Sequence, residues 1–382
     1  MHLLALRACI PSRTIEPPSL VIAQTSTMNK RLLIIACSFM LLIHARTVKG
    51  FQQTKLQDKL NAWTEQATPV EPTAAQSDYD PSRVTADKIE TLELTIQDRK
   101  RVREIPLKVY LPKQTDSKQA TEVVLYSHGL GGSRDTAAFL GQRWAGRGYV
   151  AVFMQHPGSD DSIWKDEPLL KRMGAFKKAA NGKNLKLRVE DVPVVIDQLE
   201  KWNRQTAHPL QGKMNLKKIG MSGHSFGAIT TQHVGGQVSF GKTPHLDKRI
   251  TACILMSPSA PRTGSAKKAF GKIKLPWLCM TGTNDKSILG GADVENRLSV
   301  YSALPRKGHY ELVLFGAEHS AFTESKLPLD RLSRNPNHHR AIMAISTAFW
   351  DTYLRGDAEA KTWLNTDAVR SVLETKDRWQ YK

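Results

Sequence analysis

Residues 220–227 read Gly-Met-Ser-Gly-His-Ser-Phe-Gly, and this stretch decides how the rest of the sequence is interpreted. It follows an apolar run at 218–222 that is expected to be a strand, and it precedes a segment with apolar residues at helical spacing. A strand that turns sharply into a helix holds the serine between them, Ser225, strained and exposed, and side chains at Gly223 or Gly227 would collide with neighbouring backbone. The stretch therefore predicts a nucleophilic serine at the carboxyl edge of a sheet.

A second glycine-rich stretch, Ser-His-Gly-Leu-Gly-Gly at residues 127–132, follows the expected strand 123–127. Glycines there allow backbone amides to approach a substrate oxygen. We expect the amides of Leu130 and Phe226 to form an oxyanion hole, helped by the amino end of the helix after Ser225. A phosphate-binding loop is the alternative, but the Gly-x-x-x-x-Gly-Lys-[Ser/Thr] pattern is absent. The residues expected to support the two donors are His128, Gly129, Gly131, Gly223, His224 and Gly227, with the two histidines orienting loops rather than transferring protons.

A nucleophilic serine needs a base in contact with it and a third group that orients the base. Asp285 ends the turn Gly-Thr-Asn-Asp after the expected strand 277–281, and His319 lies in Gly-Ala-Glu-His-Ser after the expected strand 311–315. Because the carboxyl ends of parallel strands meet at one sheet edge, we expect Asp285 and His319 to lie beside Ser225.

Other residues remain alternatives for these two roles, and a turn-stabilising role is the alternative for Asp285 itself. The alternatives are Asp293, Glu295 and Glu318 for the acid and His309, His338 and His339 for the base. Their positions relative to the strand ends disfavour them, because His309 precedes its expected strand and the last two histidines open an expected C-terminal helix. No His-Glu-x-x-His or comparable spacing occurs, so we expect neither a catalytic metal nor a cofactor.

Short apolar runs alternate with helical segments through the rest of the chain, which is typical of a parallel sheet covered on both faces. Further buried strands are expected at 150–155 and 252–257, and helices at 136–147, 189–202, 228–234 and 340–353. Before them, 89–97 and 105–111 alternate apolar and polar residues around a charged turn, which predicts an antiparallel pair. We therefore predict an α/β fold with a mostly parallel central sheet, an antiparallel N-terminal strand pair and helices on both faces.

The first 50 residues are expected to be a signal peptide. Residues 28–50 begin with basic residues, continue through an apolar run and end in small residues. The run is shorter than the roughly 20 residues that span a bilayer, so we expect a secreted or periplasmic location, with a buried N-terminal helix as the alternative. The residues before Met28 are interpreted as a mis-assigned start or an extended n-region. Lipoprotein anchoring at Cys37 is not expected, because few apolar residues precede it.

Three further regions follow the signal peptide. Residues 51–87 are rich in Gln, Thr, Pro and Ala and predict a linker or N-terminal arm. Residues 88–382 are expected to be one catalytic domain, with a cap or lid insertion around 157–187. That insertion combines, near helical spacing, Leu169, Leu170, Met173 and Phe176 with Lys171, Arg172, Lys177 and Lys178. It has two interpretations, ordinary cap packing and peripheral contact with an anionic membrane surface.

The composition, 40% hydrophobic and 24% charged, excludes a disordered or fibrous protein. The formal net charge of +19 favours anionic partners in general, although basic residues scattered over a solvated surface give the same value. No zinc-finger, helix-turn-helix or aromatic-plus-basic repeat occurs, so no nucleic-acid partner is expected. Cys253 and Cys279 lie in apolar runs and are expected to be buried thiols.

With these residues in view, the chain resembles the α/β hydrolases, within them the dienelactone-hydrolase-like branch and the secreted platelet-activating-factor acetylhydrolase family. The matching stretches are residues 126–131, 220–227, 283–285 and 318–320. The resemblance implies the α/β-hydrolase fold, a triad of Ser225, Asp285 and His319 with Leu130 and Phe226 as oxyanion donors, and hydrolysis of short acyl esters, including acetylated phospholipids. The chain departs from true dienelactone hydrolases, which have a cysteine at Ser225, and from many acetylhydrolases, which have a glycine at Ala228.

The expected function is hydrolysis of small-molecule or lipid carboxylic esters through an acyl-enzyme. One alternative is a serine peptidase of the same fold, although this sequence has no segment that predicts the large propeller domain of that class. The other is a non-enzymatic binding protein on a hydrolase fold, a class that tends to lose the serine or the histidine.

Overall fold

The computed structural model describes residues 78–86, 88–113, 120–239, 241–287, 289, 292–326 and 330–382. The expected signal peptide and the part of the expected arm before residue 78 lie outside the described residues. Within them, the strands join in one nine-stranded sheet in the order β1-β2-β4-β3-β5-β6-β7-β8-β9. Their bounds are β1 (Lys88–Asp98), β2 (Arg103–Lys113), β3 (Thr121–Ser127), β4 (Val150–Met154), β5 (Met214–His224), β6 (Ile250–Met256), β7 (Trp277–Asn284), β8 (His309–Glu318) and β9 (Arg378–Tyr381).

The central strands pair in parallel from β4 through β3, β5, β6 and β7 to β8. The pairs β1 with β2, β2 with β4 and β8 with β9 are antiparallel. This confirms the predicted α/β class, the mostly parallel sheet and the antiparallel N-terminal strand pair. The edge strand β9 was not predicted, because four residues are too few to give a periodic signal.

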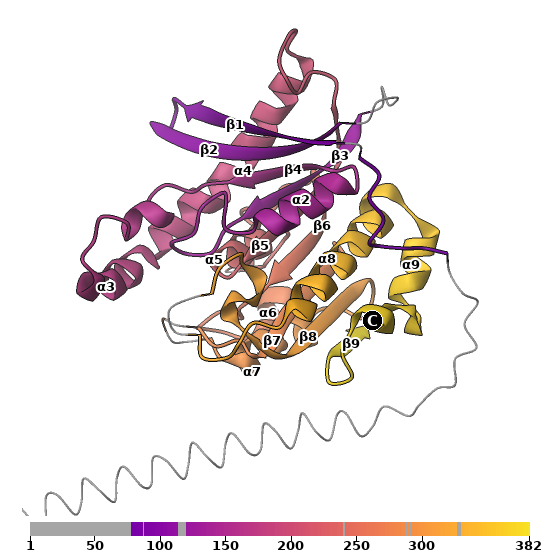
Figure 1. Ribbon diagram of the computed structural model, residues 1–382. Coiled ribbons are helices and arrows are strands. Elements are labelled where there is room, and N and C mark those ends of the chain that lie inside the picture. Colours follow the sequence, from indigo (N-terminus) through magenta and orange to yellow (C-terminus); the bar gives the residue numbers. More distant parts are fainter. Residues whose placement is uncertain are drawn as a thin grey trace, which may run out of the picture. The chain divides into compact units, whose positions relative to one another are not determined.

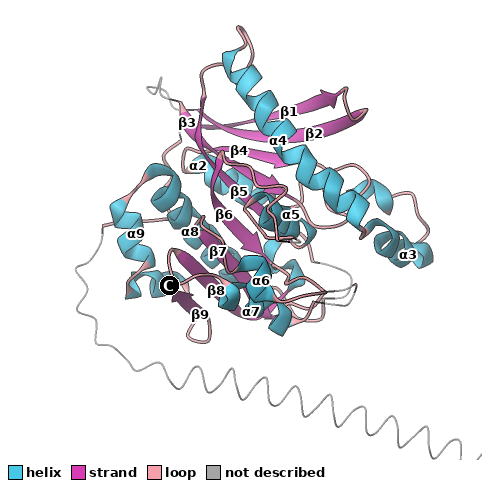
Figure 2. Cartoon of the chain, turned by 180° about the vertical axis from the view of Figure 1, so that it is seen from behind, coloured by secondary structure: helices cyan, strands magenta, loops and turns pink. Residues whose placement is uncertain are grey.

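Helices cover both faces of the sheet, as predicted. The described helices are α2 (Ala138–Gly146), α3 (Leu169–Ala179), α4 (Gly182–Arg204), α5 (Phe226–Val234), α6 (Ala266–Phe270), α7 (Val294–Ala303), α8 (Pro336–Trp350) and α9 (Ala358–Leu364), with short turns η1 (Asp161–Ile163), η2 (His319–Phe322), η3 (Asp351–Arg355) and η4 (Asp367–Val372). Figure 1 shows α2 and α8 in front of the sheet, and Figure 2 shows α4, α5, α6 and α7 on the opposite face.

Alternate residues of each central strand enter two different cores. In β3, Val124 and Tyr126 pack with the α2 and α8 side, whereas Val123 and Leu125 pack with the α4 and α5 side. All four side chains are fully buried. A strand buried on both faces reads as a continuous apolar run, which is why these strands could be found in the sequence.

The chain reverses direction across the sheet at β3. It runs from β3 to β4 on one side and returns to β5 on the other side. In open α/β sheets such a switch point leaves room at the carboxyl ends of the strands, where binding sites form.

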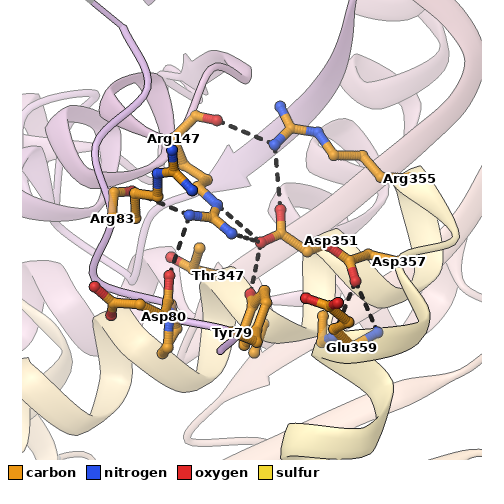
Figure 3. Close-up of polar contacts among 12 residues, drawn as sticks. Tyr79, Asp80, Arg83, Arg147, Thr347, Asp351, Arg355, Asp357 and Glu359 are labelled. Carbon is orange, nitrogen blue, oxygen red and sulfur yellow. Dashed lines mark hydrogen bonds and ion pairs between the residues drawn. The ribbon is translucent and has the colours of Figure 1, made fainter. Parts of the chain in front are cut away.

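The chain already packs against the end of α2 and against η3 before β1 begins (Figure 3). The buried carboxylate of Asp351, in η3, accepts hydrogen bonds from the hydroxyls of Tyr79 and Tyr149, both at 2.6 Å, and from Nε of Arg147 at 2.9 Å. Nη1 of Arg147 also donates to the carbonyls of Asp80 and Arg83, each at 3.2 Å. The packed region therefore includes residues before the domain start expected at residue 88.

The insertion around 157–187 folds into η1, α3 and the start of α4. One side of α3 faces solvent, with Leu169 78% and Leu170 96% exposed. On the other side, a Cβ atom added at Gly131 would lie 2.2 Å from Cε1 of Phe176. Nε1 of Trp164 donates to the Gly131 carbonyl at 2.7 Å. The insertion thus contacts the 127–132 loop through two aromatic residues.

None of the described helices is both long and apolar enough to cross a bilayer. Cys253 and Cys279 are buried free thiols, as predicted. Burial raises the pKa of both thiols.

Candidate active site

Ser225 occupies the turn between the end of β5 and the start of α5. Its φ is +55°, a strained conformation for a residue with a side chain. The turn is compact, because a Cβ at Gly227 would lie 1.8 Å from the Ser127 carbonyl oxygen, and one at Gly223 would lie 2.3 Å from the Gly227 carbonyl oxygen. Only glycine fits at these two positions, and the strain at Ser225 is fixed by backbone packing around it.

Ser225, Asp285 and His319 come together at the carboxyl edge of the sheet. Nε2 of His319 lies 2.9 Å from Oγ of Ser225. Nδ1 of the same ring lies 2.6 Å from Oδ1 of Asp285. Because a carboxylate only accepts, Nδ1 donates to Asp285 and Nε2 is left to accept the serine proton. The three residues come from the ends of β5, β7 and β8, so the sheet itself sets their spacing.

The Asp285 carboxylate is fully buried and held in its ionised form. Its Oδ2 accepts from the Thr281 hydroxyl at 2.8 Å, and its Oδ1 lies 3.0 Å from Nε of Arg297. Burial alone would raise the pKa of Asp285, but the charge of Arg297 and the contact with His319 outweigh it and hold the pKa below its ordinary value. An ionised carboxylate is what orients an imidazole and stabilises its protonated form.

Arg297 was not singled out by the sequence analysis. It lies on α7 with its side chain 2% exposed, and its Nη1 donates to the Ser257 carbonyl at 2.7 Å. The signal that could have found it is its place among Val294, Leu298 and Tyr301 at helical spacing, which puts an arginine on a buried helix face.

The three acids considered as alternatives to Asp285 either bind other groups or are exposed to solvent. Asp293 caps α7 by accepting from the Asn296 amide at 2.9 Å, and Glu295 is exposed. Glu318 accepts from the amides of Arg331 and Leu332, both at 2.9 Å. These contacts account for all three residues without a role at Ser225.

The alternative bases also lie elsewhere. Nδ1 of His309 accepts from the Trp277 amide at 3.3 Å, at the start of β8 and therefore at the opposite edge of the sheet. His338 contacts the Phe315 carbonyl at 3.0 Å, and the His339 ring stacks on Phe139 with centroids 3.8 Å apart.

The 127–132 loop lies directly against the serine turn. A Cβ at Gly129 would lie 3.5 Å from Cβ of Ser225. The Gly131 amide donates to the Ser159 carbonyl at 2.9 Å, which fixes the far side of the loop. Within the described part of the chain, the amides of Leu130 and Phe226 donate to no other group. Two amide donors are thus available at the loop and the turn that flank Ser225.

His128 and His224 orient backbone, and both are neutral. The His156 amide donates to Nε2 of His128 at 3.1 Å, so Nδ1 of His128 carries the proton and donates to the Gly129 carbonyl at 2.6 Å. Nε2 of His224 donates to the His319 carbonyl at 3.0 Å. Burial is the main cause that lowers the pKa of both imidazoles well below the ordinary value.

Among the described residues, no group of three or more His, Cys, Asp or Glu side chains is placed to hold a metal ion. Comparison with models of known protein families finds no match for this chain. A search of curated proteins likewise finds no match.

Proposed function

We propose that this protein is a serine hydrolase of the α/β-hydrolase fold that cleaves carboxylic esters through an acyl-enzyme on Ser225. The observation that carries the proposal is the position of His319, whose ring nitrogens lie 2.9 Å from the Ser225 hydroxyl and 2.6 Å from Asp285. A serine held in this way has a base in contact and an orienting carboxylate behind the base, which is what activates an otherwise weak nucleophile.

In the first half of the proposed reaction, Oγ of Ser225 attacks the ester carbonyl carbon while Nε2 of His319 takes the serine proton. The carbonyl oxygen becomes an oxyanion that the amides of Leu130 and Phe226 stabilise. The carbon–oxygen bond to the alcohol then breaks, and His319 gives its proton to the departing alkoxide. Asp285 stabilises the protonated imidazole throughout.

In the second half, water attacks the acyl carbon and His319 takes one of its protons. The bond to Oγ breaks, the proton returns to Ser225, and the carboxylic acid leaves. No redox step occurs, and the protein side chains and water supply every proton. The chemistry therefore needs only the residues at the turn, the loop and the ends of β7 and β8.

We further propose short acyl esters as the substrates, with acetylated phospholipids among them, because the motifs around Ser225 and His319 resemble those of the secreted acetylhydrolases. The layout of residues 28–50 supports a secreted or periplasmic location for this activity.

The test compares wild type with Ser225→Ala and with Ser302→Ala, a matched control on the far side of α7. We expect wild type and Ser302→Ala to hydrolyse p-nitrophenyl acetate and to be labelled by a fluorophosphonate. Ser225→Ala should lose labelling and lower kcat by a factor on the order of 10⁶.

A chain-length series from acetyl to palmitoyl esters and a peptide p-nitroanilide complete the test. Faster turnover of the short esters supports the proposed substrate class, and faster turnover of the anilide would favour a peptidase. Unchanged ester hydrolysis by Ser225→Ala would refute the proposed function.

A further inference from the structure

Arg188 on α4 is a fully buried cation near the candidate site. Among the described residues, no carboxylate lies within ion-pair distance of its guanidinium, and burial lowers its pKa to about 9. A buried charge without a contacting counter-ion costs stability unless its donors are fully used. The acceptors of the Arg188 N–H groups therefore show what holds this charge in the interior.

On one side, Arg188 holds the loop that carries the Leu130 amide. Nη2 donates to Oγ of Ser127 at 3.0 Å and to the His128 carbonyl. Nη1 donates to Oγ of Ser159 at 2.9 Å, and the carbonyl of Ser159 in turn accepts from the Gly131 amide at 2.9 Å. The guanidinium thus fixes the loop on both sides of Leu130.

On the other side, Arg188 holds the first turn of α5. Its Nε donates to Oγ1 of Thr230 at 3.1 Å, and that hydroxyl donates to the Phe226 carbonyl at 3.0 Å. The guanidinium carbon also lies 4.8 Å from the centroid of the Phe226 ring. One side chain therefore contacts both segments whose amides flank Ser225.

A hydrogen-bonded chain of Ser127, His156 and Asp191 supports this arrangement from behind. Oγ of Ser127 lies 3.0 Å from Nε2 of His156, whose Nδ1 lies 2.8 Å from Asp191. The connectivity imitates that of the Ser225 site, but all three side chains are buried and Oγ of Ser127 also accepts from Arg188. These contacts fix the Ser127 hydroxyl that Arg188 also contacts, and the three buried side chains are closed to a substrate.

We propose that Arg188 is the positioning residue of the oxyanion hole, which holds the Leu130 and Phe226 amides at a fixed separation. The inference rests on the proposed function. Donors that are already in place when the oxyanion forms stabilise it without reorganisation, and their effect is confined to the transition state. Arg188 contacts neither the substrate nor the triad. Its replacement should therefore lower kcat without changing KM or the pH dependence of kcat.

The variants are Arg188→Met, which keeps the length of the side chain, and Arg188→Lys, which keeps the charge but has too few directed donors to serve both sides. The matched control is Arg147→Met. Arg147 is also a buried arginine, and its Nε donates to the buried carboxylate of Asp351 at 2.9 Å, so it belongs to a separate buried network and contacts neither donor segment. Ser159→Ala and Thr230→Val remove one acceptor on either side and leave the arginine in place.

For each folded variant, kcat and KM are measured with p-nitrophenyl acetate, together with the inhibition constant of a trifluoromethyl ketone, which forms a tetrahedral adduct with an oxyanion. We expect Arg188→Met to lower kcat by about 10²-fold and to weaken the ketone by a similar factor. Arg188→Lys should give a smaller loss of the same kind. Arg147→Met should change both quantities by less than about threefold despite a lower Tm.

The proposal is overturned if folded Arg188→Met, or Arg188→Lys where Arg188→Met does not fold, keeps both constants within threefold of wild type. It is also overturned if Arg147→Met gives the same losses, since the effect would then follow from general destabilisation. Where neither arginine variant folds, Ser159→Ala and Thr230→Val decide by the same two constants. Failure of the proposed function looks different, because wild type itself would then neither turn over the ester nor react with the fluorophosphonate.

Discussion

Arg297 and Asp285 form a buried ion pair, and removing one partner alone destabilises the protein more than the intact pair stabilises it. The carboxylate is fully buried and the arginine side chain is 2% exposed. Breaking such a pair leaves one uncompensated charge in the interior, which costs far more than the pair itself contributes. The same charge also holds Asp285 ionised next to His319.

We therefore expect Arg297→Met to lower the free energy of unfolding by about 3–5 kcal/mol. The pKa of Asp285 should rise, because burial then acts without the opposing charge, so kcat/KM should fall at a higher pH on the acid side than in wild type. Urea unfolding and a pH–rate profile measure the two effects. Arg204→Met, which removes an exposed guanidinium in the last turn of α4, is the control and should change stability by less than about 0.5 kcal/mol. Equal stability of the two variants would contradict the buried-pair argument.

Ser225, Asp285 and His319 are predictable from the sequence because each follows an apolar strand in a short turn, and strand ends are visible in a sequence. The roles of Arg188 and Arg297 are not, because they depend on contacts between distant segments. Both arginines stand on apolar helix faces, with Arg188 four residues before Val192. That pattern marks burial but does not identify the partners.

Among the elements of the fold, α3 is the one for which the sequence allowed two interpretations, cap packing and contact with an anionic membrane. Its Leu169 and Leu170 face solvent, while Phe176 on its other side packs on the loop beside Ser225. Lys177 and Lys178 lie in its last turn. Exposed leucines with nearby cations on one short helix suit the interface of an anionic bilayer. The helix contacts the loop beside Ser225 on one side and exposes its leucines to solvent on the other.

We expect the protein to co-sediment with vesicles that contain anionic phospholipid and to do so less with phosphatidylcholine alone. The double substitution Leu169→Ser with Leu170→Ser should lower the partition coefficient on the order of tenfold. Val102→Ser removes another exposed apolar side chain, 93% exposed and far from α3 in the sequence, and should leave binding unchanged. If the double variant binds as well as wild type, α3 is only a packing element of the insertion.

Each expected strand and helix has a counterpart in the structure, although α4 begins at Gly182 rather than at residue 189. The helices α6, α7 and α9 and the strand β9 were not predicted. For α7 a local signal exists, because Val294, Leu298 and Tyr301 stand at helical spacing. β9 exists because its backbone pairs with β8, and Trp379 packs against the core that β8 already forms. That pairing is not local, so it is not encoded in a short window of sequence.

For the molecule as a whole, buried neutral histidines make stability depend on pH. Burial lowers the pKa of His156, His233 and His309 to about 4, and that of His128 and His224 well below the ordinary value. Between an unfolded pKa of about 6.5 and the folded values, the unfolded chain binds more protons than the folded one. Stability is then complete above pH 6.5 and is lost as the pH falls toward 4.

We expect Tm to fall steadily from pH 7 to pH 4.5, since each extra proton bound by the unfolded chain costs about 1.4 kcal/mol per pH unit. Thermal scans across this range measure the slope. His309→Gln removes one of the titrating groups and should make the slope shallower. A Tm that stays constant between pH 7 and pH 5 would contradict this account.

The contacts of the Asp351 carboxylate limit how far the N-terminus of this chain can be shortened. Tyr79, which lies in the segment expected to be a linker, donates a hydrogen bond to this carboxylate, and Arg147 at the end of α2 donates another. A trimmed recombinant version that starts at the first strand would leave that acid short of one hydroxyl donor inside the protein. The safe cut lies upstream of Tyr79, so expression trials should treat residues 78–86 as part of the folded body.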